Sequence, residues 1–152
     1  MGKVMNSLWN TLCQADGLDP TQRMETRLAI LKNVSALNCT IYRSDENDLD
    51  AEEEDLGDAR IVFTGAFQPP IEWNEEACSS YFDGVESNLF FTALIECEAD
   101  PESGHFFLPD VGDYVAVVTL TGLVEMYFLY DWNEDLRGRC CVLIRDEPEI
   151  EL

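Results

Sequence analysis

One continuous half of the chain contains no basic residue. Between Ile61 and Leu136, 76 consecutive residues include 15 Asp or Glu and no Lys or Arg. The whole chain of 152 residues carries 31 acidic and 9 basic side chains, a formal net charge of −22. Lys and Arg supply affinity for a phosphate backbone, and anionic lipid surfaces repel a chain of this charge. We therefore predict no direct nucleic-acid binding and no membrane partner.

The motifs of many enzymes and cofactor-binding proteins are also missing. No phosphate-binding or dinucleotide-binding glycine pattern occurs, and the single histidine, His105, has no nucleophile motif to accompany it. A calcium-loop pattern starts at Asp131, Asn133 and Asp135, but Leu136 stands where glycine is required. We expect no cofactor, no metal site and no catalytic residue, and we predict that the protein is not an enzyme.

Long apolar runs and a cysteine framework are absent as well. No apolar stretch approaches the roughly 20 residues that cross a bilayer. The six cysteines are scattered and no signal peptide precedes them, which favours a reducing, cytoplasmic location. The neighbours Cys140 and Cys141 would point to opposite faces of a strand, so a metal site shared by them is not expected.

Enough apolar material is present for a folded core. The chain is 46% hydrophobic and has 16 aromatic residues, whereas disorder combines high charge with low hydrophobicity. Its length suits one domain, and we predict a single domain over residues 1–152. Within it we expect a helical part at 1–37, a mobile acidic loop at 44–58, a mainly β part at 60–146 and an acidic tail at 147–152.

Two helices are predicted at the amino terminus. Apolar residues recur at helical spacing over residues 4–13, with Gly17 as a stop. Asp19 and Pro20 are typical of a helix start, and the second helix is expected to run to Leu37. Its apolar positions predict the buried face, which would comprise Met24, Leu28, Ile30, Leu31, Val34, Ser35 and Leu37.

The remainder of the chain has strand patterns. They cover residues 39–43, 61–67, 89–97, 114–120, 123–130 and 139–145, with a short helix at 74–82, a tight turn at 121–122 and a longer turn at 131–138. Several strands are apolar on both faces, as where Val115 and Val117 alternate with Ala116 and Val118. The predicted fold class is α+β: two N-terminal helices packed on a curled antiparallel sheet of five or six strands. The helices would cover one side, and curling or the long loops would protect the other.

The excess of acid suggests a basic partner. Compact chains of this length are roughly 40 Å across, and duplex DNA of that length carries on the order of 22 charges. In composition, though in no motif, the chain resembles the acidic inhibitor proteins by which phages and mobile elements block nucleic-acid-binding enzymes, and the immunity proteins that neutralise basic toxins. This resemblance implies a DNA-mimic or anti-defence protein that occludes a basic, nucleic-acid-binding partner.

Two tryptophans with acidic neighbours are the predicted anchors of such a partner, because an aromatic side chain with an acidic rim complements a basic surface. The predicted partner-binding residues are Glu72, Trp73, Glu75, Glu76, Asp131, Trp132, Glu134 and Asp135. Alternatively, both indoles pack over the sheet edge and the acids form a solvated shell that aids solubility. Other functions left open are an immunity or chaperone-like protein for a toxin, and a carboxylate-based hydrolase.

Overall fold

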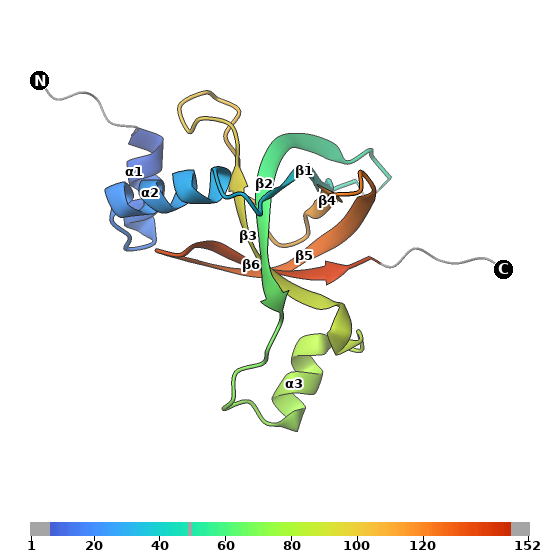
Figure 1. Ribbon diagram of the computed structural model, residues 1–152. Helices are drawn as coiled ribbons and strands as arrows, with labels where there is room; N and C mark the ends of the chain where they lie inside the picture. Colours follow the sequence, from blue (N-terminus) through green and yellow to red (C-terminus); the bar gives the residue numbers. More distant parts are fainter. Residues whose placement is uncertain (1–6, 49, 147–152) are drawn as a thin grey trace, which may run out of the picture.

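The protein is an α+β barrel in the computed structural model, which describes residues 7–48 and 50–146 (Figure 1). The predicted fold class is confirmed: the described chain has three α-helices, two of them N-terminal, and six antiparallel strands. In chain order the elements are α1 Ser7–Ala15, α2 Pro20–Leu31, β1 Leu37–Arg43, β2 Glu54–Ala66, α3 Glu75–Phe82, a 3-10 turn Ser87–Leu89, β3 Phe90–Cys97, β4 Tyr114–Val118, β5 Val124–Asp135 and β6 Gly138–Arg145.

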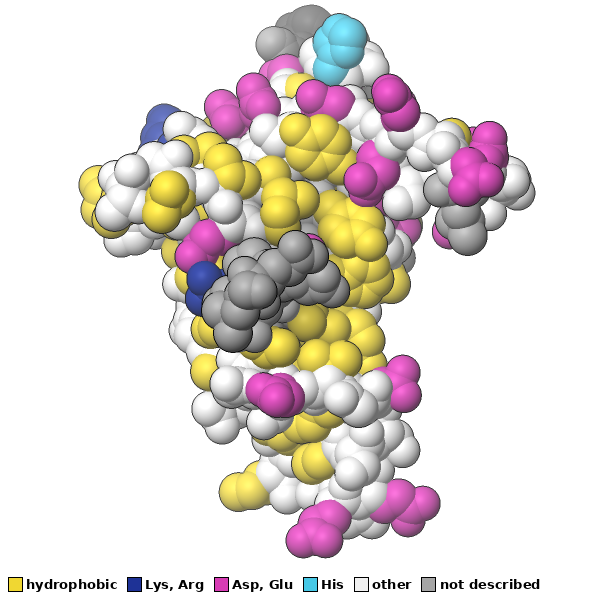
Figure 2. Space-filling model, turned by 90° about the vertical axis from the view of Figure 1, so that its right-hand side faces the viewer, with side chains coloured by type: hydrophobic (Ala, Val, Ile, Leu, Met, Phe, Trp, Pro, Cys, Tyr) yellow, Lys and Arg dark blue, Asp and Glu magenta, His cyan; other side chains and the backbone are white. Residues whose placement is uncertain are grey.

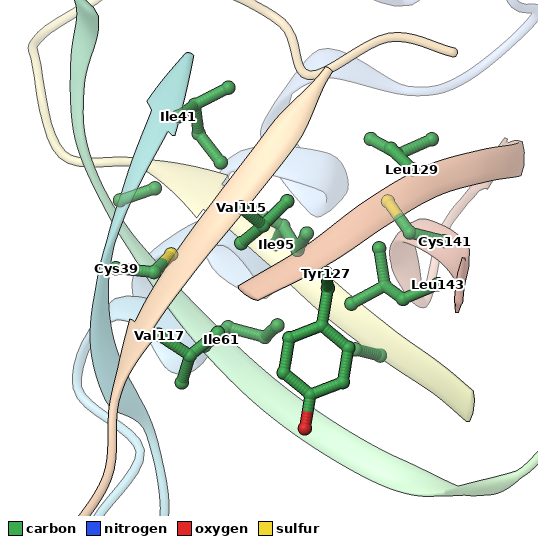
Figure 3. Close-up of a cluster of buried hydrophobic side chains, with 12 residues drawn as sticks. Cys39, Ile41, Ile61, Ile95, Val115, Val117, Tyr127, Leu129, Cys141 and Leu143 are labelled. Carbon is green, nitrogen blue, oxygen red and sulfur yellow. The ribbon is translucent and has the colours of Figure 1, made fainter. Parts of the chain in front are cut away.

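The curled sheet closes on itself in the order β1-β2-β3-β6-β5-β4, and β4 pairs with β1. Each strand sends two side chains, two residues apart, into the interior, as expected for a strand with one face inside a small barrel (Figure 3). These twelve residues are Cys39, Ile41, Ala59, Ile61, Ala93, Ile95, Val115, Val117, Tyr127, Leu129, Cys141 and Leu143. The sheet is therefore its own core, and the helices are not needed to bury its inner face.

The second helix differs from the prediction in length and in its buried face. It ends at Leu31, because Asn33 forms a turn in which its Oδ1 accepts the Ser35 N–H at 2.7 Å, and β1 already begins at Leu37. The predicted apolar face is only partly right, because Ile30 is buried as predicted but the other two buried residues are arginines. The helix buries Arg23, Arg27 and Ile30, whereas Leu28 is 40% exposed and Val34 is fully exposed.

Two strands are much longer than predicted. β2 begins at Glu54, so residues 54–58 of the predicted acidic loop are strand residues. β5 continues to Asp135 through a bulge between Leu129 and Asp131, and the predicted turn at 131–138 shrinks to two residues, Leu136 and Arg137. The predicted tail at 147–152 and the start of the first helix at 4–6 lie outside the described residues.

The two sides of the barrel differ in what covers them. α2 packs on β2, β3 and β6 (Figure 1). On the outer side of β4 and β5, the apolar residues that alternate with the core remain partly open: Val118 is 41% and Val124 59% exposed. Curling, one of the two predicted ways to protect the second side, buries the inner residues of these strands but leaves their outer residues accessible.

Candidate partner-binding surface

The segment between β2 and β3, residues 67–89, projects from the end of the barrel as an arm that contains α3 (Figure 1). Asn74 begins the helix, as predicted, and its Oδ1 accepts the Ala77 N–H at 2.8 Å. Glu75 and Glu76 occupy the first turn, where the helix dipole favours negative charge. Asp83 ends the helix in the left-handed conformation, at φ 46°. The sequence of the arm thus specifies a short helix that carries acids at its start.

An aromatic cluster attaches the arm to the barrel. Tyr81 stacks on Phe67 at 5.0 Å between ring centroids, and Trp73 lies 5.1 Å from Tyr81. Phe82 packs edge-on against Phe90 of β3 at 4.8 Å, and Phe90 is fully buried. Trp73 itself is half-buried, so one side of the indole packs in the cluster and the remainder is accessible.

A groove runs along α3 beside this cluster. Its volume is about 670 Å³, and its lining includes Trp73, Cys78 and Phe82 together with Glu75 and Glu86. Apolar walls with carboxylates at the rim suit a side chain that has an apolar stem and a cationic head, such as Lys or Arg. The described residues of the arm provide no basic side chain of their own to fill it.

The structure brings five of the eight predicted residues together. Glu72, Trp73, Glu75 and Glu76 lie on the arm. Asp131 of β5 joins them because its Oδ2 accepts the Tyr81 hydroxyl at 3.0 Å. Burial is the main cause, and this hydrogen bond the second cause, of a pKa of Tyr81 well above its usual range. The phenol therefore stays protonated and remains a donor to Asp131.

The other three predicted residues make internal contacts. The bulge in β5 turns Trp132 toward the core, where it lies under Arg139 at 3.8 Å and donates Nε1–H to Asp110 at 2.8 Å. Glu134 is only 8% exposed and bonds to arginines. Asp135 pairs with Arg137 at 2.7 Å. The position of Trp132 therefore fits the alternative interpretation, in which the indole packs over the barrel, better than that of an exposed anchor.

A buried ionic network under α2 is the feature that the sequence reasoning missed. Arg23 bonds to Glu96 and, at 2.5 Å, to Glu134, while Arg139 reaches the second oxygen of Glu134 at 3.0 Å. All four side chains are at most 8% exposed. Burial raises the pKa of Glu96, and Arg23 opposes that rise. The available signal was the spacing of Arg23, Arg27 and Ile30 at i, i+4 and i+7, which places them on one helical face.

The space beside Arg23 and Glu134 is too small for a substrate. Its volume is about 20 Å³, room for about one water molecule. Within residues 7–48 and 50–146, no group of three or more His, Cys, Asp or Glu side chains is placed to hold a metal ion. His105, the single histidine, is exposed. The paired carboxylates near Arg23 therefore have the geometry of a structural network.

Most of the positive charge in the described residues is ion-paired, whereas most of the negative charge is not. Of the eight described Lys and Arg side chains, five pair with carboxylates: Arg23, Arg43, Arg137, Arg139 and Arg145. Each of the seven arginines donates at least one hydrogen bond within the protein. Of the 28 carboxylates in the described part of the chain, five are ion-paired: Glu96, Asp113, Glu125, Glu134 and Asp135. The acids of the arm and of residues 45–58 belong to the remainder, which can attract a positively charged partner.

No helix in the described residues is long and apolar enough to cross a membrane. Comparisons of the chain with protein-family models, with curated proteins and with solved structures found no match.

Proposed function

We propose that this protein is a non-enzymatic acidic inhibitor that occludes a basic, nucleic-acid-binding protein in the cytoplasm. The observation that carries the proposal is the arm, where Trp73 and its groove lie among Glu72, Glu75 and Glu76 without a basic residue nearby in sequence. Aromatic anchors within an acidic rim are suited to a basic surface. A DNA mimic is one form of this function, and it competes with duplex DNA for the same partner.

The two acidic regions have different roles in this proposal. The carboxylates of residues 45–58 attract the partner over about 10 Å at physiological salt, so they act on the association rate. The arm makes the lasting contacts, since Trp73 and the groove can bury apolar surface as well as charge. Losing arm residues should therefore speed dissociation.

Capture of proteins from a lysate on the immobilised protein, followed by elution with duplex DNA, tests the proposal. We expect nucleic-acid-binding proteins that DNA displaces and that salt weakens. The triple substitution E72Q/E75Q/E76Q should reduce the affinity for a captured protein about tenfold through faster dissociation.

The matched control is E52Q/E53Q/E54Q, which removes the same charge from the loop before β2 and the start of that strand. It should slow association and leave dissociation nearly unchanged. Equal losses for both triple variants would mean that net charge alone binds the partner. Binding that DNA does not displace would contradict the nucleic-acid-binding nature of the partner.

A further inference from the structure

The outer side of β1, β4, β5 and the carboxyl end of β6 carries an apolar stripe. α2 packs on β2, β3 and the start of β6 near Gly138, and α3 contacts β5 at Tyr130 and Asp131. Strand pairing aligns the side chains of the stripe in rows: Tyr42, Tyr114, Phe128 and Ile144 form the first, Ala116 and Met126 the second, and Val118 and Val124 the third. The first row is about 14 Å wide, because it crosses three spacings of about 4.8 Å between strands, and the second and third rows each cross the one spacing between β4 and β5. An α-helix about 10 Å across is narrower than the first row and can contact all three rows where they meet on β4 and β5.

Carboxylates border the stripe on two sides. Asp58 accepts a hydrogen bond from Thr40 of β1 at 3.3 Å. On the far side, Asp146 donates its N–H to the Met126 carbonyl at 2.9 Å. Figure 2 shows apolar side chains gathered on the face on which β6 ends, with acidic side chains above, below and to the right and basic side chains at the left. The stripe adjoins the arm, since Ile144 pairs with Phe90, which is buried under the aromatic cluster.

We infer that the stripe binds a cationic amphipathic helix of the partner, with the apolar face of that helix on the stripe and its basic residues against the acidic borders. A closed barrel has no free strand edge, so an added β-strand would lack backbone partners. A second copy of this chain would bring another charge of −22 against the same borders. The inference rests on the proposed function for the positive charge of the partner, but it concerns a different set of residues.

The test uses three synthetic peptides and two pairs of substitutions. The peptides are an amphipathic helix of leucine and lysine, its analogue with glutamate in place of lysine, and one with serine in place of leucine. V118S/V124S removes apolar surface from the stripe, while V111S/L136S removes comparably exposed side chains elsewhere, since Val111 is 53% and Leu136 44% exposed. Because all four side chains are partly exposed, both variants should fold.

We expect the leucine and lysine peptide to bind most tightly. V118S/V124S should weaken that binding about tenfold, and V111S/L136S should change it less than about twofold. The inference is overturned if V118S/V124S binds like the wild type, or if the serine and lysine peptide binds as tightly. It is also overturned if sedimentation shows a dimer that V118S/V124S dissociates.

The two proposals can fail separately. If E72Q/E75Q/E76Q loses its captured partner while V118S/V124S retains full affinity for the peptide, the proposed role of the arm is supported and the proposed role of the stripe is contradicted. If V118S/V124S weakens binding of the peptide while capture yields no protein that DNA displaces, the proposed role of the stripe is supported and the proposed inhibitor function is contradicted.

Discussion

The two sides of the barrel use charge in opposite ways. Under α2, Arg23 and Arg139 neutralise Glu96 and Glu134 in a buried network. On the arm and around the stripe, carboxylates such as Glu72 and Asp146 are exposed and make no ion pair with any residue that the structure describes. Buried pairs fix the position of a helix, whereas unpaired surface acids at a large net charge repel one another. Charge under α2 is therefore structural, whereas the acids on the open side, which comprises the arm and the stripe, include exposed carboxylates such as Glu72 without an ion pair in the described chain.

Removing the central cation should produce the largest effect. R23M leaves Glu96 and Glu134 buried without Arg23, which we expect to lower the free energy of unfolding by about 3–5 kcal/mol. K32M, at an exposed residue of the same region, should change it by less than about 0.5 kcal/mol. Urea denaturation measures both. A small loss for R23M would mean that the network contributes little to the attachment of α2.

Close packing of the helix on the barrel can be tested at a glycine. An added Cβ at Gly138 would lie 2.8 Å from Cδ1 of Ile30, and φ there is 123°. G138A should therefore lower the free energy of unfolding by about 1–3 kcal/mol. Gly84 in the arm also has a positive φ, 82°, but nothing lies near its Cβ position. If G84A lowers the free energy of unfolding as much as G138A does, then backbone strain, and not the clash with Ile30, causes the destabilisation by G138A.

The acids of the open side should contribute little to stability. E72Q/E75Q/E76Q removes three exposed carboxylates, and we expect the free energy of unfolding to change by less than about 0.5 kcal/mol per residue. Loss of the helix-dipole interaction in α3 and relief of repulsion oppose each other. Thermal denaturation and circular dichroism check this result. Unfolding of the triple variant would show that the acids of the arm are needed for stability. It would contradict the difference in the use of charge between the arm and the network under α2.

The smallest effect should appear in acid. The Trp132 indole N–H lowers the pKa of Asp110. The resulting stability is present above the pKa of an unfolded Asp, about 3.9, and is lost as the pH falls through the lowered value. The stability difference between the wild type and D110N should thus shrink as the pH falls from about 5 to about 2. A difference that stays constant with pH would contradict a role for the ionised carboxylate.

Local patterns predicted most of the fold. The helix start at Asp19 and Pro20, the cap at Asn74 and the α+β class follow from short-range rules and are confirmed. Adjacent Cys140 and Cys141 do lie on opposite faces, half-buried and buried. Barrel closure was not predicted, because it depends on the pairing of β1 with β4, which are about 70 residues apart, and no local pattern encodes that pairing.

The candidate site was only partly predictable, for a related reason. The acids around Trp73 belong to one local segment, so sequence reasoning grouped them correctly on the arm. The acids around Trp132 looked equivalent, but Arg23 and Arg139 bind Glu134 from elsewhere in the chain. The sequence indicated the stripe, because several strands are apolar on both faces. Whether α2 covers it depends on which strands that helix packs against, and no local pattern gives this.

Amide hydrogen exchange tests the contrast between the two sides most directly. The measurement compares the protein alone with the protein bound to a basic protein recovered by capture and displaced by duplex DNA. We predict new protection in residues 67–89 and 114–130, on the arm and the stripe, and unchanged exchange in α2. Protection confined to α1 and α2, or equal small changes throughout the chain, would contradict the account.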